Sequence, residues 1–229
     1  MPYYRAIHLL FIHIPKTGGT SIESFLNKFC RYELFTLAPL HADKPHKRES
    51  IVNKHSILPN EFKKISYQHQ TYSTIYKYRA KFGINFDGIR MLAVVRNPYH
   101  RALSDLFFFR LIDNKSSKDD VFSALRLFIE SEPSKYDNHN IPQYKFVCDE
   151  NEVIVPDITI LKTETLSHEM NILGFIYNEP VKNKGGAKQN YDSMLNVKSI
   201  RLINQVYERD FREFGYPTLK NNNNYKLNK

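Results

Sequence analysis

The chain has 229 residues, enough for one α/β domain with a full core but too few for two complete domains. Hydrophobic residues make up 41% and charged residues 25%, as in ordinary soluble globular proteins, and the two distant cysteines exclude a disulfide framework and a CxxC-type zinc site. The net charge of +9 predicts either a solvated basic surface or an anionic partner, such as nucleic acid, a phosphorylated cofactor or an acidic polysaccharide.

An apolar stretch at 6–14, rich in Ile, Leu and Phe, predicts the first buried strand. It is too short to span a bilayer and lacks the basic flank and small-residue cleavage site of a signal peptide, so we expect a soluble, cytoplasmic protein. Residues 15–19 contain a proline and two glycines, which end the strand, and apolar residues at helical spacing come after them. The start of the chain therefore predicts a strand, a tight loop and a helix.

A second strand and helix are expected in the middle of the chain. Residues 37–66 are polar and basic, which predicts an excursion over the surface, and the apolar run over 89–95 predicts a buried strand. Asn97 suits an N-cap and Pro98 suits the first helical position, so a helix is expected over 98–111. The remaining expected elements are helices over 71–82, 120–131 and 164–173, a core strand over 157–161, and a long C-terminal helix that ends at Gly215.

Strands that alternate with helices predict a single α/β domain over 1–217, built as a three-layer parallel sheet with helices on both faces. Residues 218–229 are polar and low in complexity, which predicts a disordered tail. In a parallel sheet of this kind ligands bind at the carboxyl ends of the strands, and the loop at Lys16 follows such an end.

This first loop combines a lysine, two glycines and three hydroxyl side chains. Glycines let the backbone approach a ligand closely, and the N–H groups and positive dipole at the start of the next helix favour an anion. The lysine adds a charge, and the hydroxyls add donors. The pattern predicts a phosphate site, although an ordinary strand-to-helix turn with an exposed lysine would share it. The residues are Lys16, Thr17, Gly18, Gly19, Thr20 and Ser21.

Two familiar phosphate-binding patterns do not fit this loop. Lys16 precedes Gly18 and Gly19, whereas the lysine of the nucleotide-triphosphatase loop follows its glycines, which disfavours ATP hydrolysis; a dinucleotide G-x-G-x-x-G pattern is also missing. The order P-K-T-G-G-T-S instead resembles the 5′-phosphosulfate loop of sulfotransferases that use 3′-phosphoadenosine 5′-phosphosulfate. The segment VVRNPYHRALSDLFFF resembles the 3′-phosphate motif of that family, with Arg96 at a strand end and Ser104 eight residues later on the next helix.

Further segments extend the resemblance over residues 6 to about 217, to carbohydrate sulfotransferases of the Golgi type and their soluble relatives. HQTYSTI resembles their H-x-T segment, HNIPQYKFVCD their H-x-x-P-Q segment, and ERDFREFGY their closing helix. The resemblance implies a P-loop-like phosphosulfate-binding loop at Lys16 and a separate 3′-phosphate pocket. It also implies in-line attack by an acceptor hydroxyl, with a carbohydrate as the expected acceptor, while Lys16 stabilises negative charge on the leaving 5′-phosphate.

The acceptor hydroxyl needs a base, and His69 is the first choice. Imidazole titrates near neutral pH, and the H-x-T segment resembles the catalytic position of the family. A histidine that caps or packs on the following helix would give the same pattern. Glu23, on the first helix, and His139 are the other candidate bases.

Two further cations each have two interpretations. Lys188 belongs to a cationic, glycine-containing segment that either closes over the nucleotide or stays solvated. Arg101 either contacts the 3′-phosphate or forms an i,i+4 ion pair with Asp105, and we favour the ion pair.

The sequence therefore favours a sulfotransferase that binds no nucleic acid and requires no metal. The histidines of the polar segment 37–66 lack the spacing of metal ligands. Two other classes stay open: a nucleotide kinase-like enzyme with a phosphate loop, and a non-catalytic module that binds polyanions through its net charge.

Overall fold

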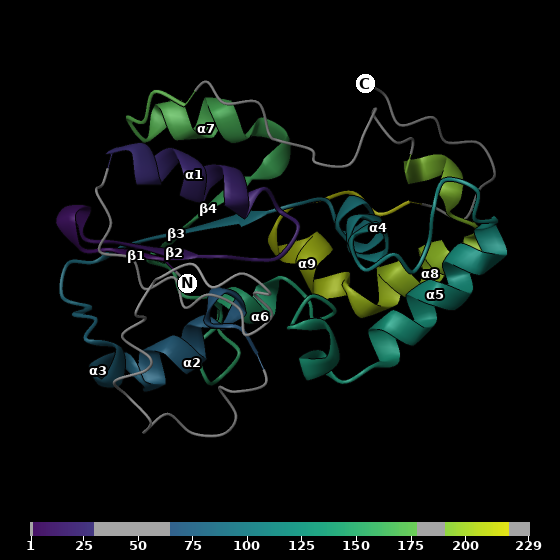
Figure 1. Cartoon of the computed structure of the whole chain (residues 1–229), viewed down its shortest axis with the longest axis horizontal. Helices are drawn as coiled ribbons and strands as arrows, with labels where there is room; N and C mark the ends of the chain where they lie inside the picture. The colour runs from purple at the N-terminus through teal and green to yellow at the C-terminus, as the bar shows by residue number, and fades with distance from the viewer. Residues whose placement is uncertain (1, 30–64, 178–190, 220–229) are drawn as a thin grey trace, which may run out of the picture.

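A sheet of four strands forms the centre of the molecule. The computed structural model describes residues 2–29, 65–177 and 191–219 (Figure 1). The strands are β1 (Tyr3–Tyr4), β2 (Leu9–Ile12), β3 (Arg90–Val95) and β4 (Ile158–Lys162). They lie in the order β1-β2-β3-β4, in which β2, β3 and β4 are parallel and β1 is antiparallel to β2.

The first predicted strand, 6–14, is only partly extended. Arg5–Ile7 form a 3₁₀ turn, and His8 adopts a left-handed conformation with φ of 48°, so the chain folds back between β1 and β2. The expected parallel arrangement is therefore correct for β2 to β4 and wrong for the short edge strand β1. The Gly or Asn residues that usually mark a tight hairpin turn are absent from this one, so the sequence carried no signal for it.

Helices cover both faces of the sheet and give it three layers (Figure 1). α1 (Gly19–Phe29) and α7 (Leu166–Ile172) lie on one face, and α2 (Tyr72–Lys77), α3 (Arg79–Phe82) and α6 (Tyr144–Val147) lie on the other. Side chains alternate along β2, because successive residues of a strand point to opposite faces. Leu10 and Ile12 pack with α2 and α6, whereas Phe11 packs with α1 and α7.

A helical region beside the sheet has a core of its own. It consists of α4 (Pro98–Phe108), α5 (Lys118–Glu130), α8 (Val197–Val206) and α9 (Glu208–Glu213). The predicted start of α4 is confirmed, because the Asn97 side chain accepts a hydrogen bond from the N–H of Tyr99 at 3.0 Å and Pro98 is the first helical residue. The predicted C-terminal helix is in fact two helices that meet at the buried Tyr207.

The other predicted elements are found with modest changes. The helix expected over 71–82 is broken at Tyr78 into α2 and α3, and the helix expected over 164–173 begins with a 3₁₀ turn, Thr163–Thr165, before α7. The strand expected over 157–161 is β4, and the helix expected over 120–131 is α5.

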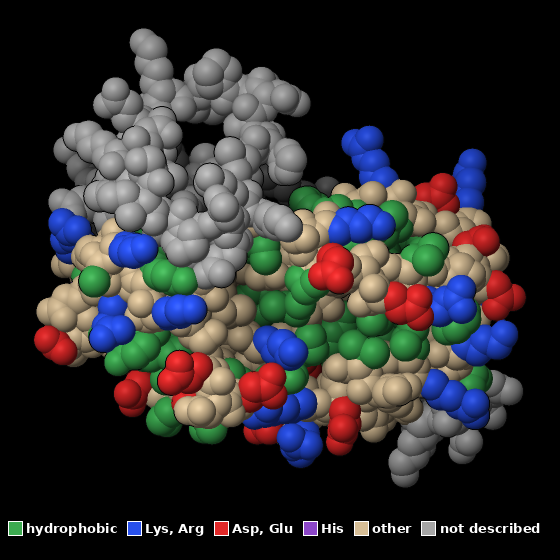
Figure 2. Space-filling view, turned by 90° about the horizontal axis from the view of Figure 1, so that it is seen from below, with side chains coloured by type: hydrophobic (Ala, Val, Ile, Leu, Met, Phe, Trp, Pro, Cys, Tyr) green, Lys and Arg blue, Asp and Glu red, His purple; other side chains and the backbone are tan. Residues whose placement is uncertain are grey.

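Three further expectations concern membrane spans, the distribution of surface charge and the two polar segments. Within the described ranges, no helix combines the length and the apolar character needed to span a membrane. Basic side chains lie scattered among acidic ones on the face seen in Figure 2, instead of gathering in a stripe. The polar segment 37–66 falls almost entirely outside the described residues, and so does the predicted tail 218–229 apart from its first two residues.

Candidate active site

The loop that contains Lys16 connects the carboxyl end of β2 to the start of α1. Lys16 and Gly18 have φ values of +63° and +92°, so two residues in left-handed conformations turn the chain sharply. Thr17 is fully buried, and its hydroxyl donates to the carbonyl of Ile14 at 2.9 Å, so this donor is used inside the loop. At the start of α1, Thr20 is exposed.

Residues at the ends of the neighbouring strands brace this loop. Arg96, directly after β3, donates from Nη1 to the carbonyl of Lys16 at 3.1 Å. Thr163, directly after β4, places its Oγ1 2.5 Å from the carbonyl oxygen of Thr17. The carboxyl ends of the three parallel strands thus meet at the loop, as expected for a ligand site in a parallel sheet.

The Lys16 side chain is partly removed from solvent. Its ammonium nitrogen lies 4.3 Å from the centroid of the Phe108 ring, which is itself 56% exposed. Burial lowers the pKa of Lys16, Asp105 raises it, and the nearby Arg96 lowers it again. Two cations held close together in a partly desolvated place favour an anionic ligand.

The two residues predicted for the 3′-phosphate keep hydrogen-bond donors available. Gln143 holds the main chain of Arg96, accepting from its N–H at 2.8 Å and donating to its carbonyl at 2.9 Å. Among the residues that the structure describes, Nε and Nη2 of Arg96 have no hydrogen-bond partner. The hydroxyl of Ser104, half-buried on α4, also has none in these ranges.

Arg101 is a structural strut. Its buried guanidinium donates from Nε to the carbonyl of Pro15 at 3.1 Å, from Nη1 to Ile141 at 2.9 Å and from Nη2 to His139 at 2.8 Å. The predicted ion pair with Asp105 is wrong, because Asp105 is paired with His139 instead. Arg101 therefore ties the loop to a distant segment of the chain through main-chain carbonyls.

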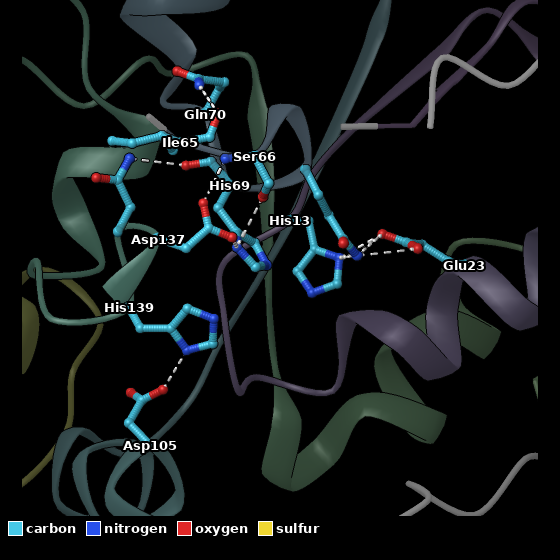
Figure 3. A network of polar contacts seen from close by, with 11 residues as sticks. His13, Glu23, Ile65, Ser66, His69, Gln70, Asp105, Asp137 and His139 are labelled. Atoms are coloured by element: carbon cyan, nitrogen blue, oxygen red, sulfur yellow. Dashed lines mark hydrogen bonds and ion pairs between the residues drawn. The ribbon is translucent and has the colours of Figure 1, made fainter. Parts of the chain in front are cut away.

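Three histidines lie in a row beside the loop (Figure 3). The ring centroids of His13 and His69 are 5.3 Å apart at an interplanar angle of 71°, and those of His69 and His139 are 4.8 Å apart at 89°. Each ring bonds through Nδ1 to a carboxylate: His13 to Glu23, His69 to Asp137 at 2.7 Å, and His139 to Asp105 at 2.6 Å. The fold thus gathers three histidine–carboxylate pairs in one place.

His69, the predicted base, has the geometry of a proton acceptor. Its Nδ1 donates to Asp137, which leaves the lone pair on Nε2. Burial lowers the pKa of His69 to about 4, although the hydrogen bond to Asp137 raises it, so the ring is neutral at neutral pH. The cap of α2 is Thr71, whose side chain accepts from the N–H of Thr74 at 3.4 Å, so His69 does not cap the helix that follows it.

His13 is a site residue with no counterpart among those predicted. It lies in the first apolar stretch and is 4% exposed. Glu23 holds it. Burial raises the pKa of Glu23, but the hydrogen bond and charge of His13, the N-terminal charge and the hydrogen bond from Gln68 together bring it below its usual range. A Cβ atom at Gly19 would lie 2.7 Å from Nε2 of His13, so a larger residue there would push the ring away. The available signal was a histidine within an apolar stretch, two residues before the first residue of the motif P-K-T-G-G-T-S.

Glu23 and Lys188 are two further predicted site residues. The carboxylate of Glu23, an alternative base, is occupied by His13 and also accepts from Nε2 of Gln68 at 3.1 Å. Lys188 lies outside the described residues.

Two sets of contacts join the loop to His69. On one side, the Lys16 ammonium lies over Phe108, whose ring stacks on His139 at 5.3 Å between centroids, and His139 meets His69 edge to face. On the other side, the start of α1 packs against His13, which also meets His69 edge to face. The loop lysine and the histidine row therefore belong to one site.

Comparison with known proteins identifies the family of this chain. A model of the sulfotransferase family matches residues 4–217, a span that includes the Lys16 loop, the Arg96 segment and all three histidines. Searches of curated proteins and of solved structures gave no match. Because the family match covers nearly the whole chain, the protein belongs to the sulfotransferase family.

Proposed function

We propose that the protein transfers a sulfuryl group from 3′-phosphoadenosine 5′-phosphosulfate to a hydroxyl group, with a carbohydrate as the acceptor. The observation that carries this proposal is the single site shared by the Lys16 loop and His69, which the contacts through Phe108 and His139 join. Membership of the family supports the class of reaction. The geometry supports a division of the site into a donor side and an acceptor side.

On the donor side, we assign the 5′-phosphosulfate to the loop and the 3′-phosphate to Arg96 and Ser104. The N–H groups at the start of α1 and the positive end of its dipole suit the first anion. Lys16 adds a charge at the same place. The free donors of Arg96 and the half-buried hydroxyl of Ser104 suit the second.

On the acceptor side, we assign His69 as the general base. Its Nε2 takes the proton of the acceptor hydroxyl while the acceptor oxygen forms a bond to sulfur. The bond from sulfur to the bridging oxygen breaks, and its electron pair stays on the leaving 5′-phosphate, where Lys16 stabilises the charge. Asp137 stabilises the imidazolium that forms, because it bonds to Nδ1 of the same ring.

A carbohydrate acceptor is supported by an exposed aromatic ring beside the loop and by the sequence resemblance. The exposed ring of Phe108 lies directly beside the Lys16 ammonium. Lys16 and His139 already contact this ring, so the part of it that stays exposed to solvent is the apolar surface that a sugar would contact. The resemblance of the H-x-T and H-x-x-P-Q segments to carbohydrate sulfotransferases points in the same direction.

Ligand stabilisation tests the donor. Adenosine 3′,5′-bisphosphate without metal should stabilise the protein by about 2.7 kcal/mol at a hundredfold excess over its dissociation constant. ATP, with or without magnesium, should stabilise it much less. Equal stabilisation by ATP, or a need for magnesium, would instead favour a kinase-like enzyme.

A single substitution tests the assigned 3′-phosphate pocket. Arg96→Ala should weaken the binding of adenosine 3′,5′-bisphosphate and leave the poorer binding of AMP, which lacks a 3′-phosphate, almost unchanged. Calorimetric titration of both ligands into both proteins measures this difference. An equal loss for the two ligands would show that Arg96 acts on the loop, through its bond to the Lys16 carbonyl, and not on the 3′-phosphate.

A further inference from the structure

Three side chains of the histidine row form a group that resembles a metal-ligand set. His69, Asp137 and His139 each offer one ligand atom, and these atoms lie within 4.8 Å of one another. Within the described ranges, no other three His, Cys, Asp or Glu side chains come this close in such an arrangement. Two imidazoles and one carboxylate are a ligand set that suits zinc and related transition metal ions.

Two of the three ligands are oriented from behind by further residues (Figure 3). The main-chain N–H of Ser66 donates to Oδ1 of Asp137 at 2.5 Å, and Oδ2 faces His69. Asp105 bonds to Nδ1 of His139 at 2.6 Å, which leaves Nε2 as the nitrogen for a ligand. Outer partners of this kind fix the orientation of metal ligands and raise their basicity.

The separations within the group require little adjustment. Metal bonds of about 2.0–2.2 Å place the ligand atoms of a tetrahedral site roughly 3.3–3.6 Å apart. Nδ1 of His69 and Oδ2 of Asp137 are 2.7 Å apart as hydrogen-bond partners and would have to open by roughly 0.6–0.9 Å, while no two ligand atoms of the group are more than 4.8 Å apart. The side chain of Asp137 is 32% exposed, so an ion can reach the group from solvent.

We propose that His69, Asp137 and His139 bind a divalent transition metal ion such as Zn²⁺, and that the bound ion inhibits the transferase. A neutral imidazole has one nitrogen lone pair. If the metal takes Nδ1 of His69, the ring proton moves to Nε2; if the metal takes Nε2, the base atom is covered. In both cases His69 can no longer accept a proton. The inhibitory half rests on the proposed function, whereas the binding half does not.

Metal titration of the full chain, first freed of metal with a chelator, tests the binding half. We compare the unmodified protein with His139→Ala, with Asp137→Asn and with the matched control His168→Ala, whose histidine is exposed on α7. The unmodified protein and the control should bind one Zn²⁺ per chain at least tenfold more tightly than the two cluster variants. Co²⁺ should give a visible absorption band in the unmodified protein and in His168→Ala, but not in His139→Ala or Asp137→Asn.

A folding control and the pattern of Zn²⁺ affinities decide whether the cluster binds the ion. Circular dichroism checks that each variant is folded, and if His139→Ala is not, the partly exposed and nearly isosteric Asp137→Asn decides. Equal Zn²⁺ binding by all the folded proteins, or no binding by the unmodified one, overturns the proposal. Zinc bound by histidines elsewhere in the chain would be common to all four titrations and would subtract out.

Enzyme assays test the inhibitory half. Zn²⁺ should abolish sulfate transfer by the unmodified protein, a chelator should restore it, and the affinity for adenosine 3′,5′-bisphosphate should not change. An enzyme that fills the site with Zn²⁺ and keeps its full rate overturns inhibition. If the metal-free protein transfers sulfate to no acceptor, yet binds Zn²⁺ at the cluster when the ion is added, the proposed function is overturned and the metal site stands.

Discussion

The proposed donor side and the proposed acceptor side of the site are built in different ways. The donor side is one continuous loop between β2 and α1, shaped by the left-handed conformation of Lys16 and by hydrogen bonds to main-chain carbonyls. The acceptor side is assembled from side chains of separate segments, and its hydrogen bonds join imidazoles to carboxylates. The first arrangement is local and is built on the backbone, whereas the second exists only after the chain has folded.

This difference has consequences for charge. The donor side presents cations, and burial lowers the pKa of Lys16 at a place meant for an anion. The acceptor side presents His69 as a neutral ring, because burial lowers the pKa of His69 to about 4. A charged clamp for the donor and a neutral base for the acceptor are what the proposed transfer needs. Variants of the two sides should therefore fail in different ways.

The largest effect is expected at His69. His69→Ala should lower turnover by about 10²- to 10⁴-fold and leave the affinity for adenosine 3′,5′-bisphosphate nearly intact, because a base on the acceptor side touches no phosphate. Transfer of labelled sulfate to a panel of glycans, run beside calorimetric titration, measures both quantities. His168→Ala is the control. Full activity in His69→Ala would move the base to Glu23 or His139.

The donor side should show both defects at once. Lys16→Ala should lower the rate by about 10²- to 10³-fold and also weaken bisphosphate binding, since the ammonium serves the bound anion and the leaving group alike. The same two assays apply, with the exposed Lys115→Ala as the control. If Lys16→Ala loses rate but binds the bisphosphate normally, Lys16 belongs to the acceptor side, and the two sides do not differ in the way proposed.

Arg101 connects the two sides, so its loss should affect both through stability. Arg101→Met leaves the carbonyls of Pro15, His139 and Ile141 without their donor, which should lower the free energy of unfolding by about 3 kcal/mol. Urea unfolding measures the change, with the exposed Arg126→Met on α5 as the control. If the two variants were equally stable, the strut would contribute nothing and the two sides would be held together by other contacts.

The smallest expected effect is a pH dependence of stability from the acceptor side. The pKa of His69 is about 4 in the folded protein and 6.5 as the ordinary value, so the unfolded chain takes up this proton first as the pH falls. Stability is full above pH 6.5 and is lost as the pH falls toward 4. Between pH 7 and pH 5 the unmodified protein should lose on the order of 2 kcal/mol more than His69→Gln does. Chemical unfolding at the two pH values measures this, and equal losses would mean that His69 is not buried as described.

Much of the fold follows from local patterns, and the departures have local causes. The apolar runs at β2, β3 and β4 and the capping signal at Asn97 were sufficient to place these elements. The antiparallel β1 was missed because its turn lacks the usual residues, and the break at Tyr207 was missed because the apolar stripe continues across it. In both places long-range packing, which has no short-range signal, decided the backbone.

For the site, the sequence by itself determined the position of the loop that contains Lys16, because its residues are consecutive and a strand followed by a proline and two glycines predicts a tight turn. It also singled out His69 and His139 as separate candidates. Only the tertiary structure decided that they lie edge to face, that His13 joins them, and which carboxylate holds each ring. His69 and Asp137 are 68 residues apart in the chain, and no local pattern specifies a partner at that separation. The pairing depends on which buried side chains must satisfy one another once the sheet and helices have packed.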